Sequence, residues 1–327
     1  MPAPSLVSLD EIRAAGDVVA GRLVRTPLLS VSLPVRGAPA PGREAGTRVW
    51  LKAENLQTTG SFKPRGVLNK LRHLTAEQKQ RGLITISAGN HAQALAYAAA
   101  AEGLRALVVM PEAASATKVA ATRGYGAEVV LHGTTQQALD KMHELREARG
   151  LTLVHPYDDA LVIAGQGTVG LEILDDLPDV DVVVVPVGGG GLISGIAAAV
   201  KQSRPSARVV GVEPEGAPTI TEALRAGRPV RLERIATIAD GLTAPVAGQL
   251  TLAHVQALVD EMVLVSDEEI AEGLRAVMRH AKLVAEPAGA AGVAALLAGR
   301  VAAASGARAA VVVSGGNVDL ARIKQVL

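Results

Sequence analysis

Eight short runs of β-branched residues, separated by alanine-rich stretches, set the pattern of this chain. The runs are VWLKA (49–53), LITIS (83–87), ALVVM (106–110), AEVVL (127–131), VVVVPV (182–187), RVVGVE (208–213), MVLV (262–265) and AAVVVS (309–314). Strands that are apolar on both faces and alternate with helices are typical of βαβ units, in which helices cover both sides of a parallel sheet. The pattern therefore predicts an α/β fold with parallel sheets.

The composition narrows the class of protein further. With 327 residues, 49% of them hydrophobic, the chain is long enough for two lobes or one large α/β unit. A net charge of +1 and an aromatic content of 2% argue against a nucleic-acid partner. The chain has no cysteine, which fits a reducing, cytoplasmic location. No apolar stretch is long enough to span a bilayer and no signal peptide is recognisable, so we expect neither membrane insertion nor secretion.

Polar, glycine-rich turns follow three of the predicted strands. They are AGNH (88–91), GGGG (188–191) and GGN (315–317). Ligands of open parallel sheets bind at the carboxyl ends of the strands, so these turns are expected to converge on one site. The alternative for each turn alone is that glycine merely ends a strand.

Lys63 lies in the segment TTGSFKPRG (58–66), and its setting suggests a reactive amine. Pro64 suits the first position of a helix, and Ser61 is placed to cap that helix. The positive end of a helix disfavours a second cation, so the pKa of the Lys63 ammonium should fall and the neutral amine should be nucleophilic enough to form a Schiff base. The alternative is a solvated surface lysine beside a turn.

The four glycines at 188–191 come directly after a strand and before an apparent helix, LISGIAAAV. Unhindered backbone amides at a helix N-terminus form a phosphate cradle. Glu213 follows about twenty residues later, as a ribose-binding acid does in a nicotinamide-binding Rossmann protein. The spacing GGGGLISG fails the G-x-G-x-x-G/A pattern because Ser194 takes the last position. A nicotinamide enzyme is therefore the secondary interpretation.

Seven motifs together resemble the pyridoxal-phosphate-dependent threonine dehydratases of fold type II, a family related to serine racemase. They are TTGSFKPRG, SAGNHAQ, HPYDDALVIAGQGT, PVGGGGL, TIADG, AEPAGAAG and SGGN, and they span nearly the whole chain in family order. The resemblance implies a tryptophan synthase β-like fold of two open parallel-sheet lobes with the active site in the cleft between them. It implies a large domain of residues 1–72 and 158–327, a small mobile domain of residues 73–157, and a homodimer or homotetramer.

The resemblance also implies roles for individual residues around the cofactor, pyridoxal 5'-phosphate. Lys63, the catalytic residue, holds the cofactor as a Schiff base, and Phe62 lies beside it. The remaining cofactor-binding positions are Asn90 on the ring hydroxyl, Gly188, Gly189, Gly190, Gly191 and Leu192 on the phosphate, and Ser314 on the pyridine nitrogen. The substrate carboxylate is assigned to Ser87, Ala88, Gly89, Asn90 and His91. For His91 we favour a structural role over acid–base chemistry, and Asn90 alone is also explained as a turn former.

The implied reaction is β-elimination from a 3-hydroxy amino acid. A neutral hydroxyl at Ser314 makes the cofactor ring a weaker electron sink than a carboxylate would, which favours elimination over transamination. L-threonine, giving 2-oxobutanoate and ammonia, is the leading substrate, and L-serine, giving pyruvate, is secondary. Alternatives are a dehydratase of 3-hydroxyaspartate or phenylserine, a serine racemase-like enzyme and, from another class, a non-catalytic amino-acid sensor.

Three features of the sequence qualify the resemblance. Ala88 stands where serine racemases carry a second serine, so we expect little racemisation. Glu213 and Ala217 match the cation site of the racemase branch, but Thr219 replaces its aspartate, so we predict no divalent metal and leave a monovalent ion open. Glu286 either lines the site or caps the helix that starts at Pro287.

Overall fold

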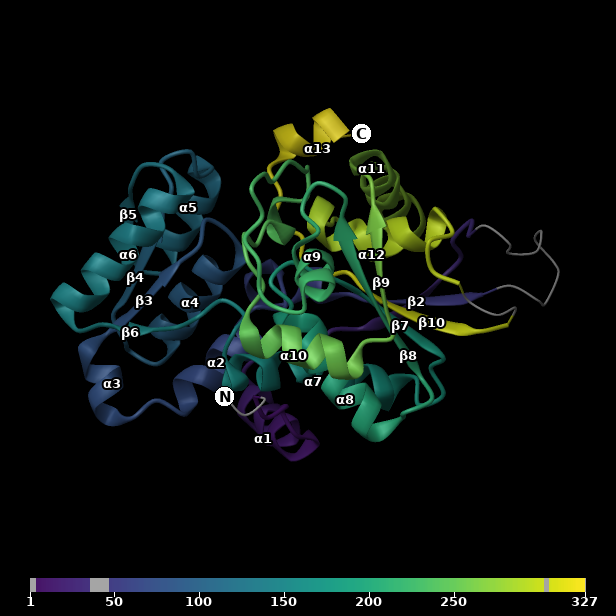
Figure 1. The fold of residues 1–327 in the computed structure, drawn as a ribbon, viewed down its shortest axis with the longest axis horizontal. Helices are drawn as coiled ribbons and strands as arrows, with labels where there is room; N and C mark the ends of the chain where they lie inside the picture. The colour runs from purple at the N-terminus through teal and green to yellow at the C-terminus, as the bar shows by residue number, and fades with distance from the viewer. Residues whose placement is uncertain (1–3, 36–46, 303–305, 327) are drawn as a thin grey trace.

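The computed structural model describes residues 4–35, 47–302 and 306–326, and within these ranges the chain forms two β-sheets surrounded by helices (Figure 1). The larger sheet has the strand order β1-β2-β10-β7-β8-β9; β1 is antiparallel to β2 and the other neighbours are parallel. Its strands are β1 (Leu28–Val31), β2 (Arg48–Lys52), β7 (Val182–Pro186), β8 (Arg208–Pro214), β9 (Glu261–Val265) and β10 (Arg308–Val312).

The smaller sheet has the order β5-β4-β3-β6, and all its neighbours are parallel. Its strands are β3 (Leu83–Ile86), β4 (Ala106–Met110), β5 (Glu128–Leu131) and β6 (Thr152–Leu153). All eight runs that the sequence singled out are strands, which confirms the α/β prediction. The sequence analysis missed β1 and β6.

Helices cover both faces of the larger sheet, and the strand side chains alternate between them. Val182 and Val184 of β7 belong to the cluster under α11 and α12, whereas Val183 and Val185 belong to the cluster under α8 and α10. This alternation is the period-2 pattern of a strand that is buried on both faces. The helices around this sheet are α1 (Leu9–Val19), α7 (Ala160–Asp176), α8 (Gly191–Ser203), α9 (Thr219–Ala226), α10 (Gln249–Leu258), α11 (Asp267–Ala276), α12 (Pro287–Leu297) and α13 (Leu320–Val326).

The smaller sheet is covered in the same way. Val108 and Met110 of β4 pack with α2, α4 and α5, whereas Leu107 and Val109 pack with α6. The elements of this part are α2 (Pro64–Arg72), α3 (Ala76–Arg81), α4 (Asn90–Ala101), α5 (Ala116–Gly124) and α6 (Thr135–Arg149). Short 3₁₀-helices are η1 (Glu54–Leu56), η2 (Thr58–Gly60) and η3 (Asp240–Leu242), and η4 (Val277–Ala281) is a π-helix.

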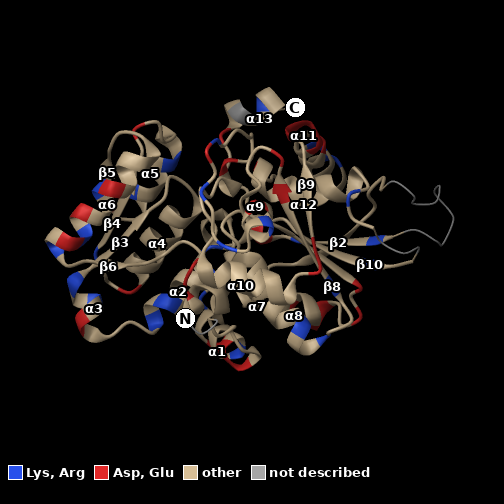
Figure 2. Ribbon diagram, in the orientation of Figure 1, with Lys and Arg blue, Asp and Glu red and all other residues tan. Residues whose placement is uncertain are grey.

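Charged residues are frequent in helices such as α3, α6 and α11, whereas α4 and α12 contain none (Figure 2). Helices without charges are suited to burial between a sheet and other elements. None of the helices in the part of the chain that the structure describes is both long and apolar enough to cross a bilayer.

A buried ion-pair network ties α2 to the larger sheet and to α7. The fully buried Arg65 guanidinium donates to both carboxylate oxygens of Glu54 at 2.8 Å and to Glu172 Oε1 at 2.6 Å. Lys52 Nζ donates to Glu172 Oε2 at 2.5 Å. Burial acts to raise the pKa of Glu54, but the neighbouring Arg65 and Lys52 outweigh it and hold that pKa below its ordinary value. The network fixes the start of α2, two residues beyond Lys63.

Candidate active site

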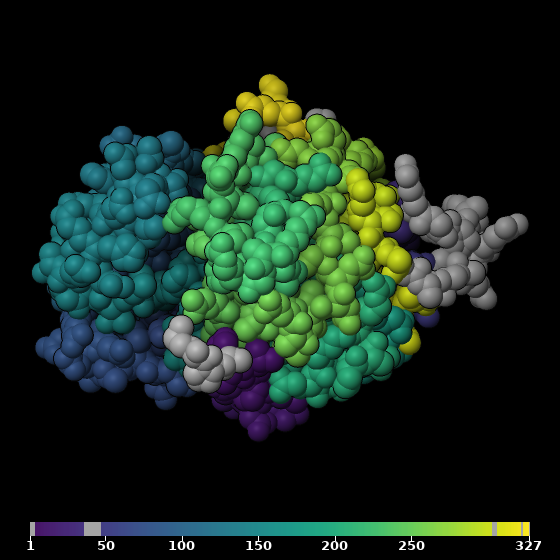
Figure 3. All heavy atoms as spheres, viewed as in Figure 1, coloured from purple at the N-terminus to yellow at the C-terminus, as the bar shows by residue number. Residues whose placement is uncertain are grey.

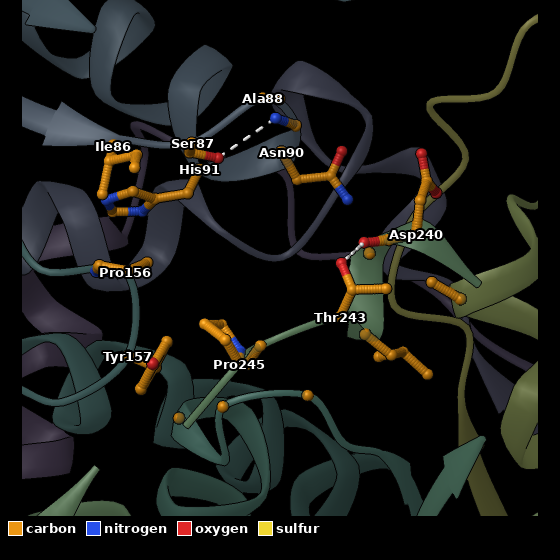
Figure 4. Close-up of a pocket in the computed structure, with 18 of the residues that line it drawn as sticks. Ile86, Ser87, Ala88, Asn90, His91, Pro156, Tyr157, Asp240, Thr243 and Pro245 are labelled. Atoms are coloured by element: carbon orange, nitrogen blue, oxygen red, sulfur yellow. Dashed lines mark hydrogen bonds between the residues drawn. The ribbon is translucent and has the colours of Figure 1, made fainter. Parts of the chain in front are cut away.

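A cavity of about 840 Å³ lies between the two sheets. Residues 87–91 after β3, residues 188–192 after β7, and Ser314 after β10 all line it. The first two of the three predicted turns therefore converge on the cavity, and the third follows directly after a lining residue. In the space-filling view, the part built on the smaller sheet and the part built on the larger sheet lie side by side (Figure 3). Figure 4 shows Ser87, Asn90 and His91 on one side of the cavity and Thr243 and Pro245 on another.

The amine of Lys63 reaches this cavity from the N-cap position of α2. Lys63 Nζ donates to the carbonyl oxygen of Pro156 at 2.9 Å and lies 5.1 Å from the centre of the Phe62 ring. Burial lowers the pKa of Lys63 to about 8, although Glu286 acts to raise it. A larger fraction of the amine is therefore neutral and nucleophilic at physiological pH than for an ordinary lysine.

Two details of the sequence argument about Lys63 are wrong. No side chain caps α2, and the buried hydroxyl of Ser61 has no hydrogen-bond partner among the described residues. The main cause of the lowered pKa is removal of the ammonium group from water rather than the positive end of the helix. The start of α2 at Pro64 is as predicted.

The turn of four glycines joins the end of β7 to the start of α8. A Cβ atom on Gly189 would lie 2.4 Å from Cδ1 of Tyr157, so a side chain does not fit there. Gly190 has a φ of +88°, in the left-handed region that favours glycine. The first amides of α8 have no partner within the helix and are available to an anion.

The loop after β3 brings Ser87, Gly89, Asn90 and His91 to the cavity. Ser87 Oγ accepts a hydrogen bond from the Gly89 amide at 3.2 Å. His91 Nε2 donates to the carbonyl oxygen of Val154 at 3.0 Å, which anchors the ring in the core. Burial, with a further contribution from Lys63, lowers the pKa of His91 to about 3, so its imidazole is neutral. This geometry favours the structural role for His91.

The remaining predicted residues also lie at the cavity. Phe62, Ala88, Leu192 and Ser314 are part of its lining. The backbone of Ser314 is tied to the lysine segment, because its carbonyl oxygen accepts from the Phe62 amide at 3.2 Å. All the residues predicted for the site from sequence are therefore found around one cavity.

Glu213, the acid of the nicotinamide interpretation, has a different place and is not among the described residues that line the cavity. Its carboxylate accepts from the Ile220 amide at 2.7 Å and from the Thr221 amide at 2.9 Å, so it caps α9. Burial raises the pKa of Glu213 to about 7. Thr219 Oγ1 donates to the Ala244 carbonyl oxygen at 2.6 Å. Both oxygens of the Glu213 carboxylate are thus engaged by the helix end.

Other residues of the site were not assigned a role from sequence. The Tyr157 ring packs under Gly189, and its hydroxyl donates to the Val246 carbonyl oxygen at 2.8 Å. Lys118 of α5 pairs with Asp240 at 2.5 Å across the space between the two sheets. Tyr157 and Asp240 fall in HPYDD and TIADG, so the motifs did contain the signal.

The sequence left two interpretations of Glu286, and the structure decides between them. Its side chain makes no capping bond to α12, lines the cavity and accepts a hydrogen bond from Asn90 Nδ2 at 2.6 Å. Glu286 is therefore part of the site rather than a helix cap.

Comparison with known proteins identifies the family. Residues 25–315 match the family described as pyridoxal-phosphate dependent enzyme. The chain belongs to this family. It is 44% identical to an L-threonine ammonia-lyase of Thermotoga maritima over 98% of this chain and 78% of the relative.

Solved structures of similar proteins support the same fold. The crystal structure of a threonine deaminase from T.th. has a TM-score of 0.86 and 42% identity, covering 96% of this chain and 99% of that one. A maize serine racemase has a TM-score of 0.89 and 35% identity, covering 98% and 97%. These similarities confirm the fold type II architecture and the resemblance to threonine dehydratases, and the family makes pyridoxal phosphate the cofactor.

The cavity has the chemical groups that this cofactor needs. The Lys63 amine can bond an aldehyde, and the turn at 188–191 leaves backbone amides free for a phosphate while excluding side chains. The site residues of the chain therefore fit the cofactor of the family.

Proposed function

We propose that this enzyme dehydrates and deaminates a 3-hydroxy amino acid, with L-threonine, giving 2-oxobutanoate and ammonia, as the main substrate and L-serine, giving pyruvate, as the second. The observation that carries this proposal is the partly buried Lys63 amine, which shares one cavity with an amide-rich turn and Ser314. Similarity to an L-threonine ammonia-lyase over nearly the whole chain supports the choice of substrate.

We assign cofactor contacts to the residues that line the cavity. Lys63 would hold the aldehyde carbon, and the backbone of 188–192 would hold the phosphate. Asn90 would face the ring hydroxyl, Ser314 the pyridine nitrogen and Phe62 the neighbourhood of the lysine link. When bound, the cofactor withdraws electrons from the Cα atom of the substrate. Because the Ser314 hydroxyl is neutral, this withdrawal is moderate, and loss of the β-hydroxyl is favoured over reactions that need a long-lived carbanion.

We assign the substrate carboxylate to Ser87, Ala88, Gly89, Asn90 and His91. These residues form the start of α4 and the loop before it, where backbone N–H groups and the helix dipole favour an anion. A neutral His91 adds no charge to this site. When the substrate amine replaces Lys63 as the partner of the cofactor, Lys63 Nζ would be free to accept the α-proton of the substrate. The lowered pKa of Lys63 keeps this amine competent as a base near neutral pH.

The wall of the cavity favours a neutral substrate side chain. Ile86, Leu139, Met142 and Leu153 form an apolar surface in the part built on the smaller sheet. The nearby cation, Lys118, is already paired with Asp240. An acidic substrate such as 3-hydroxyaspartate would place a second carboxylate against this apolar surface, although Arg231 also lines the cavity. We therefore place threonine and serine ahead of 3-hydroxyaspartate.

The domain organisation, assembly and location are proposals as well. We divide the chain into a large domain of residues 1–72 and 158–327 and a small mobile domain of residues 73–157. In support, strands β3 to β6 all fall within 73–157 and the strands of the larger sheet all fall outside it. We propose a homodimer or homotetramer by family resemblance, and a cytoplasmic location because the chain has no cysteine.

The function is tested with purified protein loaded with pyridoxal phosphate. We expect 2-oxo acid release from L-threonine, less from L-serine, and little from 3-hydroxyaspartate or phenylserine. Lys63→Ala should abolish both the release and the absorbance band of the lysine-linked cofactor. Exposed Lys282 offers the matched control, Lys282→Ala, which should retain both.

Two results would contradict the proposal. The first is an active Lys63→Ala variant. The second is rapid inversion of L-serine by the wild type without 2-oxo acid release, which would establish the racemase alternative.

A further inference from the structure

The side-chain amide of Asn90 is held from both ends by other side chains. Asn317 Nδ2 donates to Asn90 Oδ1 at 2.9 Å, and Asn90 Nδ2 donates to Glu286 Oε1 at 2.6 Å. Asn317 Nδ2 also donates to the carbonyl oxygen of Thr59 at 2.7 Å. These bonds form a chain that runs from the lysine segment to the loop after β3 and then to the start of α12.

This chain fixes which end of the Asn90 amide faces which neighbour. A carboxylate only accepts hydrogen bonds, so Glu286 selects the NH2 group of Asn90. The NH2 group of Asn317 uses its two hydrogens on Thr59 and Asn90, so it selects the Asn90 oxygen. A reversed Asn90 amide would set oxygen against carboxylate and NH2 against NH2. Glu286 takes one hydrogen of Asn90 Nδ2, and the second is left for a group in the cavity.

The three hydrogen-bonded side chains, Asn90, Glu286 and Asn317, come from separate parts of the fold. Asn90 begins α4 beside the smaller sheet, whereas Glu286 precedes α12 and Asn317 follows β10 beside the larger one. Space for the carboxylate depends on Gly315, where a Cβ atom would lie 2.3 Å from Glu286 Oε1. Glu286 is 2% exposed and does not cap its helix. Its carboxylate is thus buried with the Asn90 amide as a hydrogen-bond donor.

We propose that Glu286 and Asn317 are positioning residues that hold the Asn90 amide with an N–H directed at the ring oxygen of the cofactor. This inference rests on the proposed role of Asn90 toward the cofactor. Neither residue is assigned a proton transfer of its own. Each acts through Asn90, and the orientation depends on contacts that join the two sheets.

The charge of Glu286 gives the arrangement a pH dependence. Burial raises the pKa of Glu286 to about 7, Lys118 and Lys63 act to lower it, and Asp240 acts to raise it further. Above this pKa the ionised carboxylate accepts only, and the orientation of Asn90 is enforced. Below it, the protonated carboxyl group can itself donate, so the preference for the Asn90 NH2 group weakens.

The test uses the full-length protein loaded with pyridoxal phosphate and the single variants Glu286→Gln, Asn317→Ala and Asn90→Ala. It also uses two double variants, in which Asn90→Ala is combined with Glu286→Gln or with Asn317→Ala. The readouts are the absorption spectrum of the bound cofactor as a function of pH and the equilibrium affinity of cofactor-free protein for pyridoxal phosphate. We expect the spectrum of the wild type to change with pH as Glu286 titrates, and we expect this change to be lost in Glu286→Gln. Asn317→Ala removes one hydrogen bond to Asn90 and should weaken cofactor binding about three- to tenfold.

The double variants distinguish positioning from a direct contact. If both residues act through Asn90, adding either substitution to Asn90→Ala should change the affinity less than about twofold. Exposed Glu215 and Gln249 provide the matched controls Glu215→Gln and Gln249→Ala, which should behave as the wild type. Asn317→Asp, which keeps the shape but removes the donor, replaces Asn317→Ala if circular dichroism shows that the alanine variant fails to fold.

Each outcome has a defined meaning. The positioning role of Glu286 and Asn317 would be overturned if each substitution lowered the cofactor affinity as much in the Asn90→Ala background as in the wild type. Unchanged cofactor spectra in all single variants would also overturn it. Borohydride reduction of the wild type separates this from the proposed function: if no cofactor becomes fixed to Lys63, the proposed function itself is wrong. If it does become fixed, only the inference about Glu286 and Asn317 fails.

Discussion

At the scale of the residue, Lys63 combines a partly buried position with a single carbonyl partner. Its Nζ atom has Pro156 O at 2.9 Å, and Glu286 is the carboxylate that acts to raise its pKa. A neutral carbonyl satisfies one hydrogen of the amine without stabilising the charged form as a paired carboxylate would. The surroundings therefore favour the neutral, reactive amine.

The pKa of Lys63 predicts its reactivity in the cofactor-free protein. An amine-acylating reagent reacts with the neutral amine, so its rate at Lys63 should rise with pH and level off above about 8. The rate can be followed by mass spectrometry of the labelled peptide. A lysine in a short model peptide, with a pKa of about 10.4, is the reference. A midpoint for Lys63 equal to that of the peptide would contradict the structure-based pKa.

The sequence identified the residues of the site but not all the causes of their properties. Lys63, the glycine turn and Ser314 stand in local patterns that a single sequence displays. The Lys63 amine bonds the Pro156 carbonyl and is influenced by the charge of Glu286. Both residues are distant in sequence, and no local pattern reports these interactions. Glu286 remained undecided for the same reason, because its partner Asn90 lies 196 positions away.

At the scale of the element, α2 is the support of the catalytic lysine. It packs against α7 beside the larger sheet and against α4 beside the smaller one. The ion pairs of Arg65 with Glu54 and Glu172 hold the first turn of α2 in place. A change in this network should therefore act on stability and on the position of Lys63 together.

Arg65→Met should destabilise the protein by about 3–5 kcal/mol, because it leaves the buried Glu54 carboxylate without its paired cation and removes one of the two cations that contact Glu172. Denaturant unfolding measures this loss. Arg13, whose pair with Asp10 is exposed, gives the control Arg13→Met, for which we expect a change within about 0.5 kcal/mol. A loss below about 1 kcal/mol for Arg65→Met would show that the network contributes little.

Strands buried on both faces were predictable, whereas two of the edge strands, β1 and β6, were missed. The valine runs of β7 and β8 are continuous because helices cover both sides. By contrast, β1 is a partly exposed edge strand with the sequence LLSV, and β6 has two residues. Such short edge strands are formed by pairing with a neighbour, which a local pattern does not encode.

At the scale of the whole molecule, the proposed cofactor site draws on segments from both sheets. A ligand that binds the folded protein alone stabilises all of it, by about 2.7 kcal/mol when present at a hundred times its dissociation constant. We therefore expect removal of pyridoxal phosphate to lower the midpoint of thermal unfolding. Added cofactor should raise the midpoint of thermal unfolding less for Lys63→Ala than for the wild type. Equal midpoints for loaded and cofactor-free wild type would contradict the assignment of the cavity.

The strand order of the larger sheet also bears on how the chain is made. Within the residues that the structure describes, the β1–β2 pair joins that sheet only through β10, whose residues follow β2 by more than 250 positions. At about 5–20 residues per second, a ribosome needs roughly 13 to 50 s to reach β10 after it has made β2. During that interval the nascent β1–β2 pair has no strand to receive it, so we expect cotranslational protection by chaperones to matter most for the first fifty or so residues.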